Sequence, residues 1–257
     1  MNTAALDFSI LWPAFVAGLL VTVTHVPLGI QVLSRGIVFI DLAIAQIAGL
    51  GVIFADFMGF EPQGWAVQGF ALLAALAGAL LLTWTDKHWP DIQEALIGVS
   101  FVLAASGALL LVASNPHGGE HLKELLVGQI LWVSPAKLAL VALVYAGLMG
   151  IWFACGRDIG RIGFYMVFAC AVTISVQLVG LYLVFTTLIV PALATRRATR
   201  WRVTMGYALS ATGYALGLFI STLTDLPSGP AIVWTMAVIA IAAFAAFGRQ
   251  PPGPAAS

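Results

Sequence analysis

Apolar stretches long enough to cross a lipid bilayer alternate along this chain with short clusters of charged residues. A hydrocarbon core of about 30 Å requires roughly 20 helical residues. Six stretches without Asp, Glu, Lys or Arg reach about that length: 8–34, 62–85, 95–119, 138–156, 203–224 and 226–248. In lipid, every backbone N–H and C=O group must be bonded within the protein, so the pattern predicts helices over these stretches.

The uncharged stretch 162–195 is too long for one span at about 1.5 Å per residue, and arginines stand at both of its ends. If both ends lie on one side of the membrane, the chain crosses twice and turns near Gly180. With a further span centred near residue 47, the sequence predicts an all-α membrane protein, a polytopic bundle of about nine transmembrane helices. We expect one transmembrane domain over 1–248 and a flexible cytoplasmic tail over 249–257, which is rich in Pro, Gly and Ala.

The basic residues predict the orientation of the bundle, because Lys and Arg accumulate in short cytoplasmic loops. With the N-terminus outside, all the basic residues except Lys123 and Lys137 lie inside, and the C-terminus is cytoplasmic. The opposite orientation reverses this bias.

Composition excludes several classes of protein. With 61% hydrophobic and 9% charged residues, the chain is typical of a protein embedded in the bilayer. Its net charge of zero gives no electrostatic footprint for nucleic acid, and its two cysteines suggest neither a disulfide framework nor a zinc cluster. No P-loop, Gly-x-Ser-x-Gly or His-Glu-x-x-His motif is present, so the sequence favours neither an enzyme nor a chain that is its own ATPase.

Three polar residues inside predicted spans are candidates for a transport pathway, because such groups are costly in lipid. His25 and Gln46 lie at similar depths, and Asp41 lies about one and a half turns nearer the cytoplasm, on a different face from Gln46. We expect Pro27 and Gly29 to break the first helix and to free backbone carbonyls as ligands. The alternatives are that His25 and Gln46 form only interhelical hydrogen bonds, and that Asp41 pairs with Arg35.

An external loop holds a second candidate metal site. His117, Glu120 and His121 lie within five residues of one another around a glycine-containing turn, and imidazole and carboxylate groups are ligands for Zn²⁺. A hydrated loop that caps the next helix explains the same residues.

Four ordered stretches resemble one family of membrane proteins. The segment 175–197 closely resembles the most recognisable stretch of the zinc/manganese-type ABC importer permeases. Pro27-Leu28-Gly29 resembles the motif that closes their first span, 94–98 the opening of their fourth, and 225–230 the loop before their last. Together the matches cover nearly the whole chain.

The resemblance implies a transport subunit of the bacterial plasma (inner) membrane that is not itself an enzyme and binds no cofactor of its own. Such permeases are homodimers with the ion path at or near the subunit interface. A separate cytoplasmic P-loop ATPase uses ATP to switch access, and a periplasmic or surface metal-binding protein delivers the ion. The resemblance therefore implies import of Zn²⁺ or Mn²⁺ by alternating access.

This chain departs from the family pattern at the inferred ion site. The second span of relatives carries an Asp and a His four residues apart; here Gln46 takes the His position, Asp41 is out of step by one residue, and His25 is additional. A fourth-span His of zinc-handling members is also absent. Because the remaining polar groups are rich in imidazole, we favour zinc over manganese or iron.

The cytoplasmic link before the sixth span is short, covering only 155–161. Arg157, Asp158 and Arg161 are candidates for contacts with the ATPase, and the alternative is that they only set the topology. The competing function is a self-contained secondary carrier for a metal or another solute. Such carriers often show inverted repeats and midplane acidic residues, whereas only Asp41 is a candidate intramembrane carboxylate here.

Overall fold

A computed structural model describes residues 8–61, 64–112, 130–155, 160–198, 201–224 and 226–247. Within these ranges the regular structure is entirely helical. The described α-helices are α1 (Phe8–Arg35), α2 (Ile40–Phe57), α3 (Trp65–His88), α4 (Gln93–Val112), α6 (Pro135–Cys155), α7 (Gly160–Val179), α8 (Leu181–Ala194), α9 (Arg202–Thr224) and α10 (Ser228–Phe247). Two short 3₁₀ turns lie at Pro90–Ile92 and Ile130–Trp132. The expected tail over 249–257 lies outside the described residues.

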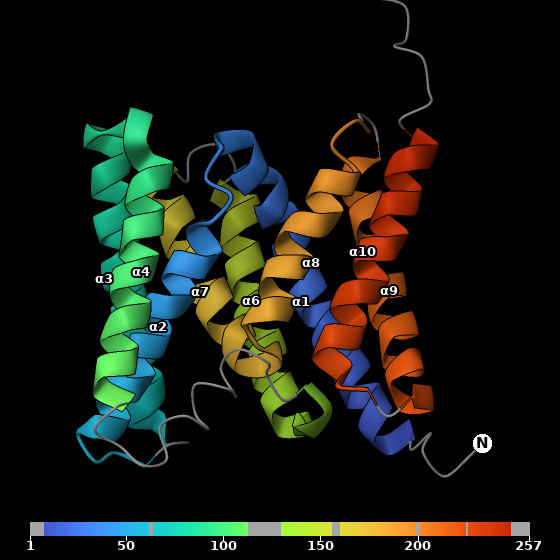
Figure 1. Ribbon diagram of the computed structural model, residues 1–257, viewed down its shortest axis with the longest axis horizontal. Helices are drawn as coiled ribbons and strands as arrows, with labels where there is room; N and C mark the ends of the chain where they lie inside the picture. The colour runs from blue at the N-terminus through green and yellow to red at the C-terminus, as the bar shows by residue number, and fades with distance from the viewer. Residues whose placement is uncertain are drawn as a thin grey trace, which may run out of the picture.

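Each of the six predicted apolar stretches overlaps one helix. Successive helices alternate in direction, so that the start of α1 and the end of α10 lie at opposite ends of the bundle (Figure 1). Six of the described helices, α1, α2, α3, α6, α7 and α9, are long and apolar enough to cross a membrane. The all-helical prediction is confirmed. The total of nine crossings and the direction of the termini remain predictions.

The uncharged stretch 162–195 forms two helices, as expected from its length. Gly180 separates α7 from α8 with a φ of 88°, a conformation that a residue with a Cβ rarely adopts. The turn that brings the chain back is therefore fixed by this glycine.

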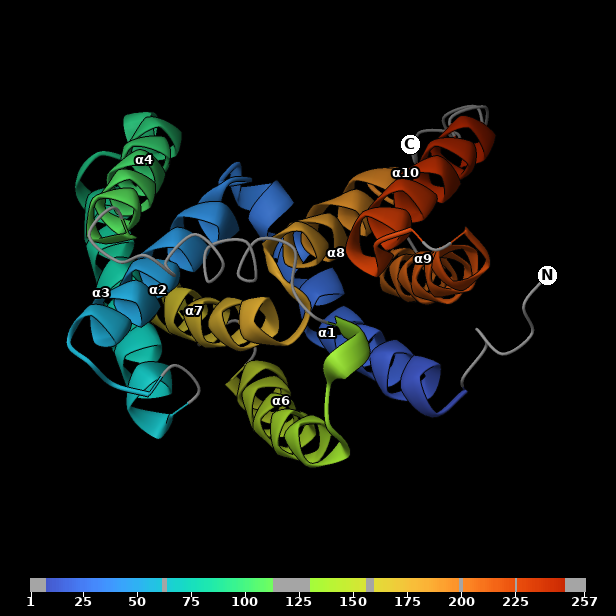
Figure 2. The ribbon, with the colours of Figure 1, turned by 60° about the horizontal axis from the view of Figure 1, so that its bottom comes forward.

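The helices form two groups joined at the centre. α2, α3 and α4 pack together at one side, and α8, α9 and α10 pack together at the other (Figure 2). α1 lies against α8 and α9, α7 contacts helices of both groups, and α6 covers α1 and α7 from outside. Small residues make the close contacts: Ala71, Ala75 and Ala79 of α3 are fully buried.

The expectation that Pro27 and Gly29 break the first helix is wrong. α1 continues through Pro13 and Pro27 to Arg35. Because Pro27 has no N–H, the carbonyl of Val23 loses its usual partner one turn later. The hydroxyl of Tyr207, on α9, donates a hydrogen bond of 3.2 Å to that carbonyl, so the freed acceptor is satisfied by a neighbouring helix and the helix persists.

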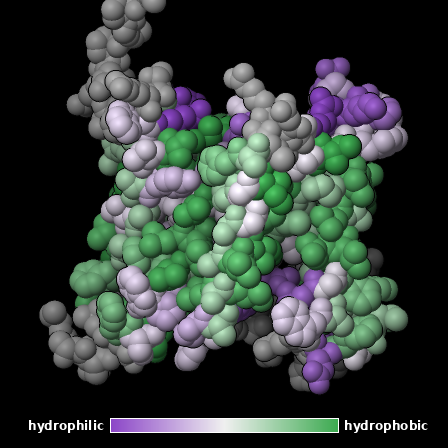
Figure 3. All heavy atoms as spheres, turned by 180° about the vertical axis from the view of Figure 1, so that it is seen from behind, coloured by the Kyte–Doolittle hydropathy of each residue, from purple (hydrophilic) through white to green (hydrophobic). Residues whose placement is uncertain are grey.

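The surface matches the chemistry of a bilayer. Apolar residues cover the middle of the face seen in Figure 3, and hydrophilic residues gather toward its edges. Among the described basic residues, one end of the bundle carries Arg35, Lys87, Arg161, Arg196, Arg197 and Arg202, whereas Lys137 lies in the first turn of α6 at the other end. The described basic residues thus gather at one end of the bundle, and the assignment of that end to the cytoplasm remains a prediction.

Gly29 permits a close approach of α1 to α8, which generates a prediction. A Cβ built on Gly29 would lie 1.8 Å from the carbonyl oxygen of Leu188, on α8, whereas one built on Gly147 of α6 would meet nothing within 4 Å. Gly29→Ala should therefore destabilise the protein by about 1–3 kcal/mol, the usual cost of overpacking. Thermal unfolding in detergent measures this, with Gly147→Ala as the matched control. Equal melting temperatures for the two variants would contradict the tight contact.

Candidate functional site

Asp41 lies in the first turn of α2 and is completely buried. Neither of its carboxylate oxygens has a hydrogen-bond partner among the described residues. Burying an unpaired carboxylate costs several kcal/mol, so such a group is rarely kept for stability. Its position at a helix N-terminus, where the helix dipole favours negative charge, is the one stabilising feature of its local surroundings.

The orientation of α2 directs Asp41 toward the centre of the molecule. Leu50 faces Gly107 of α4, and Asp41, nine residues earlier, lies about 180° from it around the helix. The other helices that contact α2 on its inner side are α7 and α8. Asp41 therefore lies on the face that α2 presents to the junction of the two helix groups.

The alternative that Asp41 serves as the ion-pair partner of Arg35 is wrong in this structure. The guanidinium of Arg35 lies over the ring of Phe164, 4.1 Å from its centroid. Within the described residues Asp41 takes part in no ion pair. The carboxylate is left available to another ligand.

Glu94, which belongs to the matched stretch 94–98, supports the start of α2. Its Oε1 atom accepts a hydrogen bond of 3.4 Å from the backbone N–H of Phe39, two residues before Asp41. Phe39 also stacks on Phe185 of α8, with ring centroids 6.4 Å apart. The sequence alone predicts no role for Glu94, although its place in the stretch 94–98 is a signal that could have identified it.

His25 is fully buried in the middle of α1. Its Nδ1 atom lies 3.1 Å from the carbonyl oxygen of Val21 and 2.8 Å from the Thr24 hydroxyl. A proton on Nδ1 satisfies the carbonyl, and the lone pair of the neutral ring is then on Nε2. Nε2 is buried and has no partner among the described residues. An imidazole oriented in this way presents the nitrogen that binds metal ions in many proteins.

His25 faces the side of α1 that packs on α8 and α9. A Cβ on Gly18, two turns earlier on α1, would meet the ring of Tyr214, and one on Gly29 would meet α8. The hydroxyls of Tyr214 and Thr187 lie 2.8 Å apart and join α9 to α8. The imidazole therefore belongs to the polar region between α1, α8 and α9.

His25 and Gln46 lie on helices that pack against different neighbours. α1 packs mainly on α8 and α9, whereas α2 packs mainly on α3 and α4. Gln46 is half-buried and lies about 140° around α2 from Asp41. In the described part of the chain, no group of three His, Cys, Asp or Glu residues could hold a metal ion. The structure thus presents two separate polar positions. Asp41 lies on the face of α2 toward α7 and α8, and His25 lies between α1, α8 and α9.

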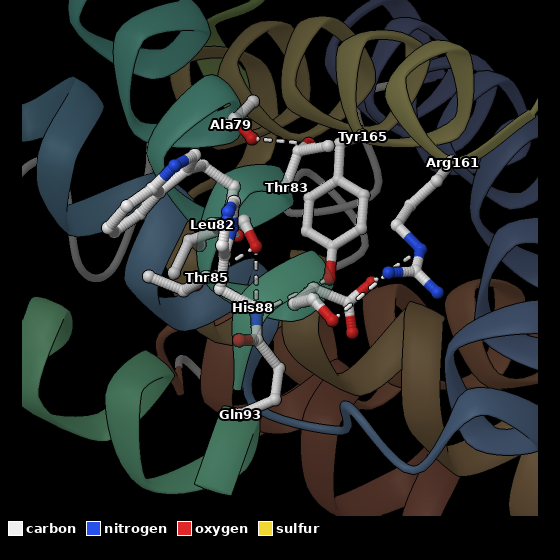
Figure 4. Close-up of polar contacts among 10 residues, drawn as sticks. Ala79, Leu82, Thr83, Thr85, His88, Gln93, Arg161 and Tyr165 are labelled. Carbon is white, nitrogen blue, oxygen red and sulfur yellow. Dashed lines mark hydrogen bonds and ion pairs between the residues drawn. The ribbon is translucent and has the colours of Figure 1, made fainter. Parts of the chain in front are cut away.

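Of the remaining predicted site residues, the structure describes Arg161. His117, Glu120 and His121 of the outer loop, and Arg157 and Asp158 of the cytoplasmic link, fall outside the described residues. Arg161 begins α7, and its Nε atom forms an ion pair of 3.0 Å with the Asp86 carboxylate (Figure 4). Its Nη1 atom also donates to the Asp86 carbonyl at 3.0 Å, so Arg161 fixes the start of α7 to the end of α3.

Comparison with known proteins gives consistent matches along the chain. The model of the ABC 3 transport family matches residues 7–159 and 156–247. The high-affinity zinc uptake system membrane protein ZnuB of Haemophilus influenzae is 24% identical over 248 residues, covering 88% of this chain and 93% of that protein. An uncharacterised membrane protein of Synechocystis is 27% identical over 251 residues, covering 89% of this chain and 88% of that protein.

A solved structure has the same fold. PsaBC from Streptococcus pneumoniae, determined in complex with Fab, matches with a TM-score of 0.74 and 20% identity. The match covers 93% of this chain and 92% of that one. The helix arrangement described above is therefore shared with this solved structure.

The unpaired state of Asp41 predicts an unusual stability effect. Asp41→Asn replaces a buried acidic group that has no side-chain partner among the described residues, so the melting temperature in detergent should stay the same or rise. Thr187→Val instead removes the hydroxyl that bridges to Tyr214 and should lower the free energy of unfolding by about 1 kcal/mol. Thermal unfolding of the two variants compares an unpaired with a paired polar group. If Asp41→Asn lowers the melting temperature as much as Thr187→Val does, the carboxylate has a structural role.

Proposed function

The chain belongs to the ABC 3 transport family, the metal-importer permeases that its motifs resemble, and we propose that its own cargo is zinc, with manganese next. It is a multi-pass membrane protein. The zinc assignment is supported by the buried imidazole of His25, because zinc accepts nitrogen ligands more readily than manganese does. The name of the Haemophilus relative, a zinc uptake protein, supports the same choice.

The proposed working unit contains two copies of this chain, a cytoplasmic P-loop ATPase and a periplasmic or surface metal-binding protein. The chain has no P-loop motif of its own, so the energy for transport must come from a partner. Family matches across nearly the whole chain favour this arrangement over a self-contained secondary carrier.

One observation carries the proposed ion route: the Asp41 carboxylate is fully buried and both of its oxygens are unpartnered within the described residues. A divalent cation passing beside α2 would compensate this charge. His25 supplies a nitrogen ligand on α1, and Gln46 supplies a weaker amide oxygen on α2. Because His25 and Gln46 lie on helices with different main neighbours, the ion would meet them one at a time and be held weakly, which suits a transient site from which the ion must leave.

The ends of the bundle have proposed auxiliary roles. His117, Glu120 and His121 are proposed to receive the metal from the binding protein, because imidazole and carboxylate groups are ligands for zinc. Arg157, Asp158 and Arg161 are proposed to transmit the motion of the ATPase. The ion pair between Arg161 and Asp86 supports this proposal, since a force on the link would reach α3 as well as α7.

Transport by the reconstituted complex tests the proposed function. We expect uptake of radioactive zinc into proteoliposomes only when the chain, its ATPase and ATP are present together, with manganese taken up more slowly. Asp41→Asn should abolish uptake while the complex still assembles. Asp56→Asn, a change of the same kind on the same helix, is the control and should retain uptake. Metal uptake by the permease alone, without ATP or ATPase, would falsify the assignment to an ABC importer.

The role of His25 needs a separate variant. His25→Ala should reduce uptake at limiting zinc at least about tenfold, since loss of even an outer partner of a metal ligand weakens binding by 10–100-fold. Basal ATP hydrolysis and assembly should be unchanged. His88→Ala, an exposed imidazole at the end of α3, is the matched control. If His25→Ala takes up zinc normally, the imidazole is a packing group and the route passes by Asp41 alone.

A further inference from the structure

A cavity of about 870 Å³ lies between the end of α3 and the start of α7. Six of the residues that line it carry the argument below: Leu80, Trp84, Lys87 and His88 from α3, with Arg161 and Ile162 from α7. None of the proposed ion-route residues borders the cavity. Arg161, assigned above to ATPase coupling, is the one lining residue that already has a proposed role, and the rest of the cavity lining has none.

The cavity wall changes from apolar to cationic along α3. Leu80, Trp84 and Lys87 follow one another at helical spacing on one face, and Leu80 and Lys87 are separated by about 10 Å along the axis. Leu80 is 54% exposed and Ile162 is 59% exposed, so the apolar part of the wall opens to the side of the bundle. In a membrane this part of the cavity faces acyl chains, and the cationic part lies at the level of the headgroups.

Aromatic side chains mark the depth of this boundary. The Trp84 ring lies 4.8 Å from that of His88 and 5.1 Å from that of Trp89, measured between ring centroids. Trp84 and Trp89 are both about half exposed. Tryptophan gathers where the hydrocarbon core meets the headgroups, so the cluster places Lys87 and Arg161 at the interface.

Of the two cations that line the cavity, Lys87 and Arg161, one remains available to an anionic ligand. Asp86 neutralises Arg161 through the 3.0 Å ion pair and also holds its guanidinium in place. Lys87 is exposed, and in the described part of the chain it forms no ion pair. Figure 4 shows Arg161 reaching from α7 toward the end of α3, with Tyr165 one turn further into α7. Tyr165 and Gln93 lie within 3.5 Å and help to hold α3, α4 and α7 together behind the cavity.

We propose that this cavity binds an acidic phospholipid, with the phosphate beside Lys87 and Arg161 and an acyl chain along Leu80 and Ile162. The cationic end of the cavity matches an anionic headgroup, and its lateral apolar opening matches a lipid tail. Basic pockets between transmembrane helices on the cytoplasmic side bind such lipids. A protein partner on the cytoplasmic face would approach the end of the bundle and would not require the exposed apolar wall.

Lipid titration of the delipidated permease in detergent tests the proposal. Phosphatidylglycerol should raise the melting temperature of the wild-type protein, whereas phosphatidylcholine should not. Lys87→Gln should weaken apparent binding of phosphatidylglycerol about fivefold, the effect of losing one interfacial cation. Arg197→Gln removes a cation from the same end of the bundle but outside the cavity, and should bind as the wild type does. Native mass spectrometry of both variants provides a second measurement of bound lipid.

Three outcomes would overturn the proposal. An equal response to phosphatidylcholine would mean that the cavity does not select acidic lipids. An equal response to soluble glycerol phosphate would identify a site for free phosphate groups instead. Lipid binding that is unchanged in Lys87→Gln, together with loss of the ATPase on purification, would make the cavity a protein docking surface.

Discussion

The close contact of α1 and α8 at Gly29 is the constraint on which the arrangement of the bundle depends. Gly29 has no side chain, and the carbonyl of Leu188 occupies the space where a Cβ would stand. In lipid, helices gain little from hydrophobic association, so close packing and interhelical hydrogen bonds must hold them together. The contact joins two segments that are recognisable in the sequence, Pro27–Gly29 and 175–197. It explains why the first of them has a glycine at position 29.

Interhelical hydrogen bonds complete this contact on the side of α9. Tyr207 donates to the Val23 carbonyl that Pro27 has freed, and Tyr214 pairs with Thr187 of α8. The first bond lets α1 remain one helix through Pro27, and the second lies in the polar region between the three helices that also holds His25. The same packing therefore fixes the fold and positions a candidate metal ligand.

Most buried polar side chains of the described helices are satisfied locally, which makes the exceptions informative. Several threonines, such as Thr22, Thr83 and Thr195, donate to a backbone carbonyl four residues earlier. Asp41 and the Nε2 atom of His25 are among the few buried groups with no such partner in the described residues. Asp41 faces α7 and α8, and His25 lies between α1, α8 and α9, so α8 borders both positions at which a cation would be stabilised.

The sequence by itself determined the helices, the turn at Gly180 and the family, because lipid leaves a long apolar segment few alternatives to an α-helix and because the motifs are ordered along the chain. It also identified His25 and Asp41 as costly residues in a membrane. Only the tertiary structure decided their surroundings. The partner of the Val23 carbonyl lies 184 residues away, and Arg35 turns to Phe164 instead of Asp41. Gln46, predicted to lie at the depth of His25, stands on a helix whose main neighbours differ from those of α1. Depth follows from counting residues along one helix, whereas lateral position depends on packing against all the others.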